Sequence, residues 1–458
     1  MGADVNLRPH QLQALQDLRA AYSAGQRAPV LVMATGGGKT HTSAEIIRSA
    51  VERGRRVWFM AHLREILDAT SAKLSSEGID HGFVMAGRDY NPAHPVHVVS
   101  VQTAARRLAA LERPHLIVID ECHLAVAETY RKVVEAVGNP LLLGLTATPV
   151  RLDGRGLGEM FDALVPSCST RQLIDAGLLV PIRYYAPSRP DLATVRTVAG
   201  DYSQGDLATV MNQPTITGDA VAHYAKLAPG RPCVVFATNV RHAEDTAEAF
   251  RAAGYRALAI SGQSDSEDRD RALRGLADGS LDVVVNCQLW VAGVDCPAIG
   301  CVVLLAPTKS VTKYLQSVGR GLRTAPGKSD LVVLDHAGNA YQHGLPTEPR
   351  EWTLEGARKR AKSDEDVPSV RQCERCYFVY EPAPACPSCG HVNPRKVSLL
   401  RQRDGELAEL MEIKRKQRDE VRQARTVEEL TKVARERGYS MGWVWKMARV
   451  RSARGARA

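Results

Sequence analysis

Short, fully apolar runs alternate with helix-length amphipathic segments along the first 150 residues of the chain. Such runs indicate parallel strands that are covered by helices on both faces. The runs of this first block are Val30–Ala34, Val57–Ala61, Val96–Val101, Leu116–Asp120 and Leu141–Thr146. The alternation resumes with Cys233–Phe236, Ala257–Ile260, Val283–Asn286, Val302–Leu305 and Leu331–Leu334. The pattern therefore predicts an α/β protein with two parallel-sheet lobes.

Breaks in this pattern divide the 458-residue chain. Proline and glycine are frequent between Val150 and Pro229, where we expect a connector and peripheral elements of the second lobe. Apolar periodicity is lost after Gly338, and Glu348–Pro368 is polar and charged. We predict a first lobe over 1–165, a connector with the second lobe over 166–340, a linker over 341–370, a zinc ribbon over 371–395 and a basic helical tail over 396–458.

No apolar run approaches the length of about 18 residues that a membrane-spanning helix needs. Residues Met1–Gln11 also lack the apolar segment of a secretory signal peptide. We therefore expect a cytoplasmic protein with no membrane partner. Its cysteines are then expected to be reduced, and most of the scattered ones to be small buried hydrophobic residues.

Charge is distributed unevenly along the chain. There are 60 Lys and Arg against 51 Asp and Glu, a net charge of +9. From Lys396 to the C-terminus there are 17 basic and 9 acidic residues, so this tail alone accounts for +8. A basic tail on a nearly neutral body indicates a polyanionic partner, and we expect its arginines to contact nucleic acid. An arginine-rich coding bias is the alternative explanation.

A glycine-rich turn, ATGGGKT (Ala34–Thr40), directly follows an apolar strand and opens a helix. In this context, backbone N–H groups and the helix N-terminus can bind phosphate oxygens. We expect the phosphates to lie against Thr35, Gly36, Gly37 and Gly38. Lys39 would reach the β- and γ-phosphates and Thr40 would ligate Mg²⁺. Met33 stands where the general pattern has glycine, so the match is incomplete.

A second buried strand, within LIVIDECH (Leu116–His123), ends in two carboxylates. Beside a phosphate-binding turn, the two carboxylates can divide the work of hydrolysis. Asp120 would hold Mg²⁺, and Glu121 would orient and deprotonate the attacking water. His123 would face the other lobe and sense the nucleotide. Together the two motifs predict a nucleoside triphosphate hydrolase.

Five further segments carry a resemblance to the superfamily-two helicases of the DExH type. They occur in the order expected for that family, namely LRPHQ (Leu7–Gln11), SVQT (Ser100–Thr103), LTATP (Leu145–Pro149), VAGVDCP (Val291–Pro297) and QSVGRGLR (Gln316–Arg323). The resemblance implies two tandem RecA-like lobes that close on ATP and step along nucleic acid. It also implies that SVQT contacts the bound strand.

The same resemblance assigns roles to individual residues. It implies that Gln11, with Arg8, reads the adenine, and that Asp295 joins the ATP-binding residues. It implies that hydrolysis is coupled to the strand through His123, Thr146, Thr148 and Gln316. Arg320 and Arg323 lie at i and i+3, so one helical face can direct both guanidinium groups at a phosphate. In the family, such arginines reach the γ-phosphate from the second lobe.

Within the superfamily, the chain is similar to the bacterial RadD family of DNA-repair helicase-like ATPases and to related phage DNA helicases. The similarity lies in Ala306–Asn339, in GLTATPVR (Gly144–Arg151) and in the DECH motif. It implies single-stranded or branched DNA as the substrate in repair, recombination or replication. It also implies a single-strand-binding or other repair or replication protein as a partner, in a bacterial or phage-infected cytoplasm.

Two differences disfavour a DEAD-box RNA helicase. That class has Asp-Glu-Ala-Asp where this chain has Asp-Glu-Cys-His, and His-Arg where this chain has Gln316 and Ser317. A translocase that never separates strands is an alternative, since the two lobes leave no room for a large wedge domain. A DNA- or protein-binding adaptor that ATP switches is a second alternative.

Four cysteines form two CxxC pairs with nine residues between them, Cys373, Cys376, Cys386 and Cys389. Four thiolates at this spacing suit tetrahedral Zn²⁺ in a small ribbon, and we predict a structural zinc. A redox pair is the alternative. Tyr377, Phe378 and Tyr380 would either stack on bases or pack the core of the ribbon. Further on, Leu430, Trp443 and Trp445 are expected to pack a small helical pair, and stacking of the tail aromatic residues on a displaced strand or a duplex end is the alternative.

Overall fold

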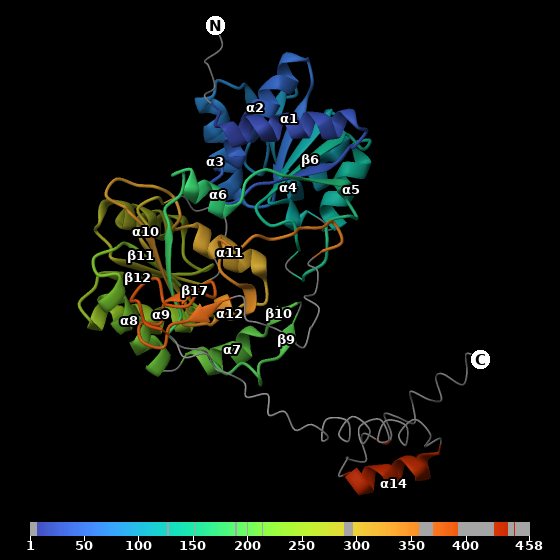
Figure 1. Cartoon of the computed structure of the whole chain (residues 1–458). Helices are drawn as coiled ribbons and strands as arrows, with labels where there is room; N and C mark the ends of the chain where they lie inside the picture. The colour runs from blue at the N-terminus through green and yellow to red at the C-terminus, as the bar shows by residue number, and fades with distance from the viewer. Residues whose placement is uncertain are drawn as a thin grey trace. The chain divides into compact units, whose positions relative to one another are not determined.

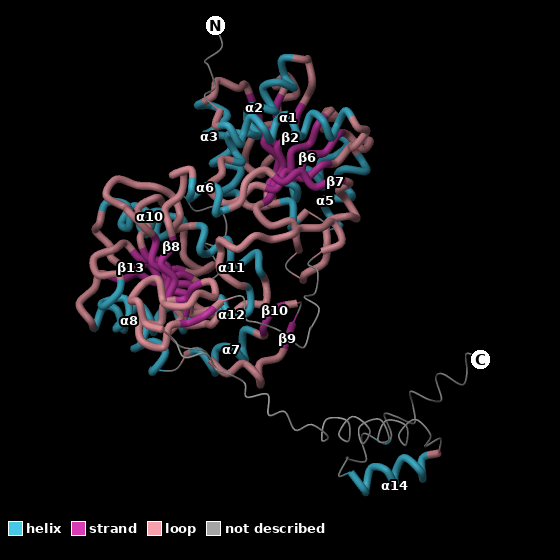
Figure 2. The backbone as a smooth tube through the Cα atoms, viewed as in Figure 1, coloured by secondary structure: helices cyan, strands magenta, loops and turns pink. Residues whose placement is uncertain are grey.

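The computed structural model describes residues 7–125, 128–151, 153–187, 190–198, 200–212, 214–287, 296–356, 370–392, 426–437 and 444. The chain divides into two compact units, residues 1–393 and 394–458. The first unit holds two separate parallel sheets with helices on both faces (Figures 1 and 2). The predicted α/β architecture of two RecA-like lobes is therefore confirmed.

The sheet of the first lobe has seven strands in the order β3-β4-β2-β5-β6-β1-β7, and all its pairs are parallel. Its strands are β1 (Pro29–Val32), β2 (Val57–Ala61), β3 (His81–Val84), β4 (Val96–Ser100), β5 (Leu116–Asp120), β6 (Leu141–Thr146) and β7 (Ala163–Pro166). Its helices are α1 (Pro9–Ser23), α2 (Lys39–Glu52), α3 (Arg64–Ser76), α4 (Val101–Arg107) and α5 (Glu128–Ala136), with short 3₁₀ turns η1 (Leu108–Ala110) and η2 (Cys122–Leu124).

Alternate residues of these strands enter two different hydrophobic cores. Phe59, for example, packs in the core under α1, α2 and α3, whereas its neighbours Trp58 and Met60 pack in the core under α4 and α5. Because both faces are buried, the strands must be apolar throughout. This is why the five predicted strands of this lobe were visible as continuous runs.

The sheet of the second lobe has six strands in the order β12-β13-β11-β14-β15-β8, again all parallel. Its strands are β8 (Ile182–Tyr185), β11 (Cys233–Phe236), β12 (Ala257–Ile260), β13 (Val283–Asn286), β14 (Cys301–Leu304) and β15 (Leu331–Asp335). Its helices are α8 (Pro214–Leu227), α9 (Val240–Ala252), α10 (Ser266–Asp278), α11 (Val311–Gly319) and α12 (Asn339–His343). Between the two sheets along the chain come α6 (Thr170–Asp175), a small hairpin of β9 (Thr197–Val198) and β10 (Asp201–Tyr202), and α7 (Gln204–Met211).

Residues 344–356, which we call the return segment, leave the second lobe and pack against the first (Figure 1). The N–H of Gly158 donates to Leu354 O at 3.0 Å, and Trp352 and Leu354 pack against the core under α4 and α5. A Cβ on Gly156 would lie 1.8 Å from Leu354 O, so only glycine fits there. This part of the predicted linker over 341–370 is therefore folded structure; residues 357–369 lie outside the described ranges.

The cysteine module is docked on the edge strand of the second sheet. Its hairpin pairs β16 (Arg371–Gln372) with β17 (Val379–Tyr380), and Phe378 forms a β-bridge with Tyr185 of β8. The N–H of Ala186 donates to Tyr377 O at 3.1 Å. The module thus pairs with β8 at the open edge of the sheet, a place where backbone groups otherwise lack partners.

In the second unit, α14 (Val427–Arg437) is the described helix of the predicted tail. Thr426 and Glu429 cap its first turn reciprocally, at 3.0 and 3.2 Å. Leu430, Ala434 and Val444 are buried together. Trp443 and Trp445, which were expected in the same small core, lie outside the described residues. No described helix anywhere in the chain is both long and apolar enough to cross a bilayer.

Candidate active site

The phosphate-binding turn joins β1 to α2 in a conformation that requires glycine. Gly36 and Gly38 have φ of 84° and 91°, in the left-handed region that other residues rarely adopt. Gly37 has no room for a side chain, because a Cβ would lie 2.6 Å from Met33 Cγ and 3.0 Å from Cys168 Sγ. Lys39 begins α2 and donates to Met33 O at 3.4 Å. These features form the phosphate-binding geometry that the sequence predicts.

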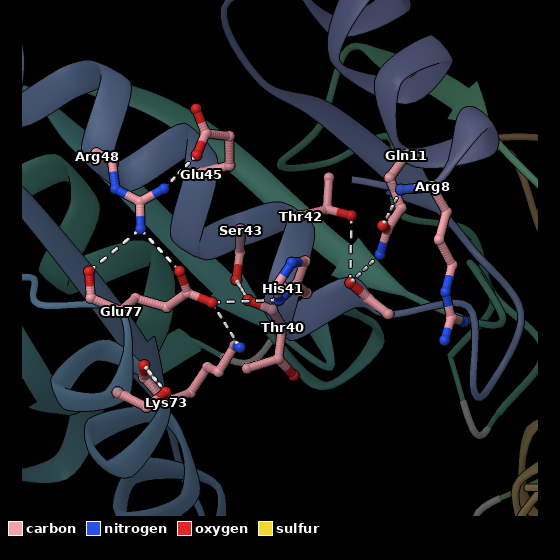
Figure 3. Close-up of polar contacts among 12 residues, drawn as sticks. Arg8, Gln11, Thr40, His41, Thr42, Ser43, Glu45, Arg48, Lys73 and Glu77 are labelled. Carbon is pink, nitrogen blue, oxygen red and sulfur yellow. Dashed lines mark hydrogen bonds and ion pairs between the residues drawn. The ribbon is translucent and has the colours of Figure 1, made fainter. Parts of the chain in front are cut away.

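Gln11 braces this turn from the start of α1 (Figure 3). Its Oε1 accepts from the Arg8 N–H at 2.9 Å, and its Nε2 lies 3.4 Å from both Gly37 O and Gly38 O. Gln11 is 3% exposed. Both ends of its amide are thus engaged within the protein, and the proposed reading of adenine would require one of these contacts to be exchanged.

Behind the turn, one carboxylate fastens α2 to the end of α3 (Figure 3). The Glu77 carboxylate oxygens lie 2.6 Å from Lys73 Nζ, 2.8 Å from Arg48 Nη2 and 3.3 Å from His41 Nδ1. The hydrogen bonds from Lys73 and then Arg48 hold the pKa of Glu77 below its ordinary value. This cluster fixes α2, whose N-terminus directly follows the phosphate-binding turn.

Asp120 ends β5 and Glu121 follows it at the edge of the sheet. Burial raises the pKa of the Asp120 carboxyl, and the nearby charge of Glu121 raises it further, while Lys39 and Arg320 oppose the shift. Glu121 has φ of 47°, a left-handed conformation that is costly for a residue with a side chain. Its N–H donates to Asp120 Oδ1 at 2.9 Å. The backbone therefore turns sharply so that both carboxylates face the same cavity.

The second lobe completes the site through the end of α11. Gln316 Nε2 donates to Glu121 Oε2 at 3.2 Å. A Cβ on Gly319 would lie 2.9 Å from Thr35 Cβ, so the helix lies directly against the phosphate-binding turn. Sequence motifs far apart in the chain thus meet across the cleft between the lobes.

The two arginines do not share a helical face, contrary to the sequence-based expectation. The helix ends at Gly319, Arg320 is its C-cap, and Arg323 is extended, where it forms a β-bridge with Leu179. The helix stops because Leu322 turns into the core of the second lobe, with its carbonyl accepting from the Val180 N–H at 2.9 Å. Both arginines nevertheless line the same cavity.

Three of the residues expected to couple hydrolysis to the strand, His123, Thr146 and Thr148, form a chain of contacts inside the first lobe. His123 Nδ1 lies 3.1 Å from Thr146 Oγ1 and 3.4 Å from Glu121 Oε2. Thr146 Oγ1 in turn accepts from the Thr148 N–H at 3.1 Å. His123 was expected to face the other lobe, but these partners belong to its own; the bond across the cleft comes from Gln316 instead. Burial lowers the pKa of His123.

These elements enclose a cavity of about 580 Å³, a size typical of ligand sites. It is lined by Arg8, Gln11, Thr35, Gly36, Gly38, Lys39, Thr40, His41, Ile66, Ala69, Thr70, Asp120, Glu121, Arg320 and Arg323. The Thr40 hydroxyl and the Asp120 carboxylate supply the oxygen ligands that Mg²⁺ prefers, so the donor set fits that ion. Asp295 lies outside the described residues, as does most of VAGVDCP.

Two histidines near the site were not singled out from the sequence. His10 Nε2 lies 2.8 Å from Gly37 O and adds a second brace to the phosphate-binding turn. His62 directly follows β2, just as Glu121 follows β5. Glu121 was identified from the sequence because it is a polar residue at the end of an apolar run. His62 has the same position after its own apolar run and could have been identified in the same way.

The four cysteines of the module converge as predicted, with all sulfur atoms within 4.8 Å of one another. Cys373 and Cys389 are 3.6 Å apart, and Cys376 and Cys386 are 3.7 Å apart. Tetrahedral Zn–S bonds of about 2.3 Å require sulfur atoms ~3.8 Å apart, so the cluster fits a zinc knuckle. Phe378 packs on Tyr185 and Tyr380 is buried in the module, whereas Tyr377 is 40% exposed. Packing therefore accounts for two of the three aromatic residues.

Two family models match the chain, one over each lobe. Residues 4–151 match the type III restriction enzyme res subunit, and residues 218–325 match the helicase conserved C-terminal domain. A 51.5 kDa protein of a Lactococcus phage is 30% identical over 78% of this chain and 76% of its own length. The chain belongs to the superfamily-two helicases. This helicase is accordingly an ATP-dependent enzyme, an NTP hydrolase that acts on nucleic acid.

Other relatives of the helicase are longer proteins. A Saccharomyces cerevisiae protein named as an ATP-dependent helicase, IRC3, is 27% identical over 77% of this chain but only 54% of its own length. The type I restriction enzyme EcoAI endonuclease subunit of Escherichia coli is 26% identical, and the match covers 46% of it. A fragment described as the HsdR subunit of a type I restriction enzyme from Vibrio vulnificus YJ016 has the same fold, with a TM-score of 0.60 at 21% identity over 74% of this chain and 67% of that one.

Proposed function

We propose that the protein is an ATP- and Mg²⁺-driven motor that moves on DNA. The observation that carries the proposal is the single cavity in which Lys39, Asp120 and Glu121 of the first lobe meet Arg320 and Arg323 of the second. A site divided between two lobes is complete only when they close. Hydrolysis in such a site is therefore tied to relative motion of the lobes.

Each residue has a distinct task in the proposed reaction. The N–H groups of Thr35–Gly38 and the Lys39 ammonium would bind the phosphates, with Thr40 and Asp120 as the ligands of Mg²⁺. Glu121 would take a proton from the attacking water, and Gln316 would hold the carboxylate in position. Arg320 and Arg323 would neutralise charge on the γ-phosphate, an effect worth roughly 10³–10⁵ in rate for an arginine finger.

The proposed substrate is DNA, single-stranded or branched. The Cys122-His123 pair and the Gln316-Ser317 pair support this choice, because DEAD-box RNA helicases carry other residues there. The name of the type I restriction-enzyme relative from Escherichia coli agrees with it. From the RadD-like motifs we infer a role in DNA repair, recombination or replication, with a single-strand-binding or other repair or replication protein as a partner. The basic tail would raise the affinity for DNA and make it salt-sensitive.

Translocation without strand separation is the second candidate. Within the described part of residues 7–356, what lies outside the two sheets and their helices is short, namely the β9–β10 hairpin, α6, α7 and the return segment. A strand-separating wedge would have to be built from these small elements. An adaptor switched by ATP is the third candidate and would hydrolyse ATP slowly.

Steady-state ATP hydrolysis distinguishes these candidates. The assay compares no polymer, single-stranded DNA, duplex DNA, forked DNA and RNA, with Lys39→Ala as the inactive control. Strong stimulation by one DNA form is the expected result, and a fork-unwinding assay then separates helicase from translocase. Slow hydrolysis that no polymer changes would instead favour the adaptor. Truncation after Asn393 tests the tail, since it should weaken DNA binding and reduce the dependence of affinity on salt.

A further inference from the structure

His62 lies beside the proposed catalytic base. Strands β2 and β5 are parallel neighbours, with Met60 paired to Ile119. Two residues further along each strand, His62 and Glu121 leave the sheet side by side, and neighbouring strands are only about 4.8 Å apart. The Glu121 carboxylate raises the pKa of His62, although burial of the ring lowers it more.

On its other side, His62 is tied to the SVQT segment (Ser100–Thr103). Gln102 Nε2 donates to the backbone oxygen of His62 at 3.4 Å. The Gln102 side chain is itself oriented, because its Oε1 accepts from Ser100 Oγ at 3.0 Å. Ser100 pairs with Ala61, the residue before His62, in the parallel register of β4 and β2. The SVQT segment is therefore joined to His62 by a side-chain hydrogen bond and to the preceding residue by strand pairing.

The imidazole of His62 also has hydrogen-bonding capacity that the fold does not use. Its Nδ1 is buried and meets no partner among the residues that the structure describes. His97 of β4 differs from His62, since its Nε2 lies 2.9 Å from Asn91 O.

We propose that His62 is a positioning residue that transmits the binding of a nucleic-acid strand at SVQT to the carboxylate of Glu121. This inference rests on the proposed function, in which SVQT contacts the strand and Glu121 is the base. A strand that binds at Ser100–Thr103 displaces Gln102, and Gln102 transmits that displacement to the backbone of His62. The imidazole then holds Glu121 in the orientation that activates water. His62 thus acts on the rate through Glu121 and does not touch the strand.

The test uses His62→Ala and His62→Asn in the full-length chain, with His97→Gln as the matched control. The measurements are kcat and KM for ATP, with and without single-stranded DNA, and the DNA affinity. In His62→Ala, we expect the stimulated kcat to fall at least tenfold more than the unstimulated kcat, with KM and DNA affinity within about twofold of wild type. His62→Asn, which keeps a side-chain donor, should recover part of the stimulation. His97→Gln should be stimulated like wild type.

Gln102→Ala provides a second, independent variant. Gln102 acts through His62 in this proposal. The variant that combines His62→Ala with Gln102→Ala should therefore lose no more of the DNA stimulation of ATP hydrolysis than His62→Ala alone. Equal loss of stimulated and unstimulated rates in His62→Ala, full stimulation in that variant, or additive losses in the double variant would each overturn the inference. A wild-type enzyme that no polynucleotide stimulates would overturn the proposed function itself, and the inference with it.

Discussion

Gln316 of the second lobe donates a hydrogen bond to Glu121 of the first, with 3.2 Å between Nε2 and Oε2. The bond joins the proposed base to a helix of the opposite lobe. When the lobes separate, Glu121 must lose this donor and with it one constraint on its orientation. Hydrolysis is thereby linked to the closed arrangement through a contact between two side chains.

Glu121→Gln tests the base directly. The amide keeps the size of the side chain and can still accept from Gln316, but it cannot take a proton. We expect kcat to fall by about 10²–10⁴, while ATP binding, measured with a fluorescent analogue, remains within about threefold of wild type. Retained turnover would exclude Glu121 as the base.

Gln316→Ala removes the contact across the cleft and leaves the carboxylate itself intact. Because only the orientation of Glu121 is affected, we expect kcat to fall about tenfold, with little change in KM for ATP. Single-turnover hydrolysis is the measurement. The nearby Lys313 is not suitable as a control, since it forms a partly buried ion pair with Asp201 at 2.9 Å. Arg131 on the surface of α5 can be replaced by alanine instead, because its ion pair with Glu135 is exposed and spans 3.8 Å.

Gly319→Ala and Gly321→Ala should distinguish an effect on the closure of the two lobes from an effect on the stability of the second lobe. A methyl group on Gly319 would meet Thr35 at 2.9 Å across the cleft, whereas one on Gly321 would meet Leu331 Cδ1 at 2.4 Å within the second lobe. We expect the first variant to lose at least tenfold in kcat with an unchanged Tm. The second should lose about 1–3 kcal/mol of stability, as overpacked cores do. Equal effects of both substitutions on Tm would show that Gly319 is not a closure contact.

Zinc removal should loosen the edge of the second lobe. Metal analysis is expected to find one zinc per chain in the wild type and in Cys168→Ser, and less in Cys386→Ser. Because Val370 and Val379 pack in the core of the second lobe, loss of the module should lower the Tm as well as the metal content. A Cys386→Ser variant with full zinc content would refute the four-cysteine site.

The Glu77 cluster predicts a pH-dependent contribution to stability. Its ion pairs and hydrogen bonds lower the pKa of Glu77 in the folded state, so the stabilisation is present above the ordinary pKa of a glutamate and is lost as the pH falls through the folded value. Glu77→Gln should therefore lower the Tm at pH 7 and approach wild type near pH 3. Glu112→Gln, which removes an exposed pair with Arg56, should change the Tm little at either pH. A Glu77 effect that does not vary with pH would exclude this linkage.

Much of the fold could be predicted because its strands are buried on both faces. All ten predicted strands occur, within one or two residues of their expected ends. Strands β3, β7 and β8 were missed because they lie at sheet edges and are only partly apolar. β8, for example, is Ile182–Tyr185 with an exposed arginine, and its partner β15 comes about 150 residues later. A local pattern cannot specify such a distant pairing.

The site residues that come at or just after the end of a predicted strand could be predicted. Glu121 directly follows β5, and Lys39 begins α2 after the turn that follows β1. The contacts of Gln316 with Glu121 and of Gly319 with Thr35 depend on how two lobes meet, and spacing along the chain contains no such information. The expected helical face for Arg320 and Arg323 was wrong because Leu322 and Gly321 belong to the core of the second lobe. Tertiary packing there overrides the helical spacing.

The return segment gives the two lobes a second attachment. The chain first passes between them ahead of β8, and residues 344–356 then pack back onto the first lobe. Two bodies joined at one point can rotate about any axis through that point, whereas two bodies held at two points rotate only about the line between them. While the return segment stays packed, the two lobes thus open and close by rotation about a single axis. We therefore expect random thermal motion to return the lobes to the closed arrangement more often than it would with a single flexible connection.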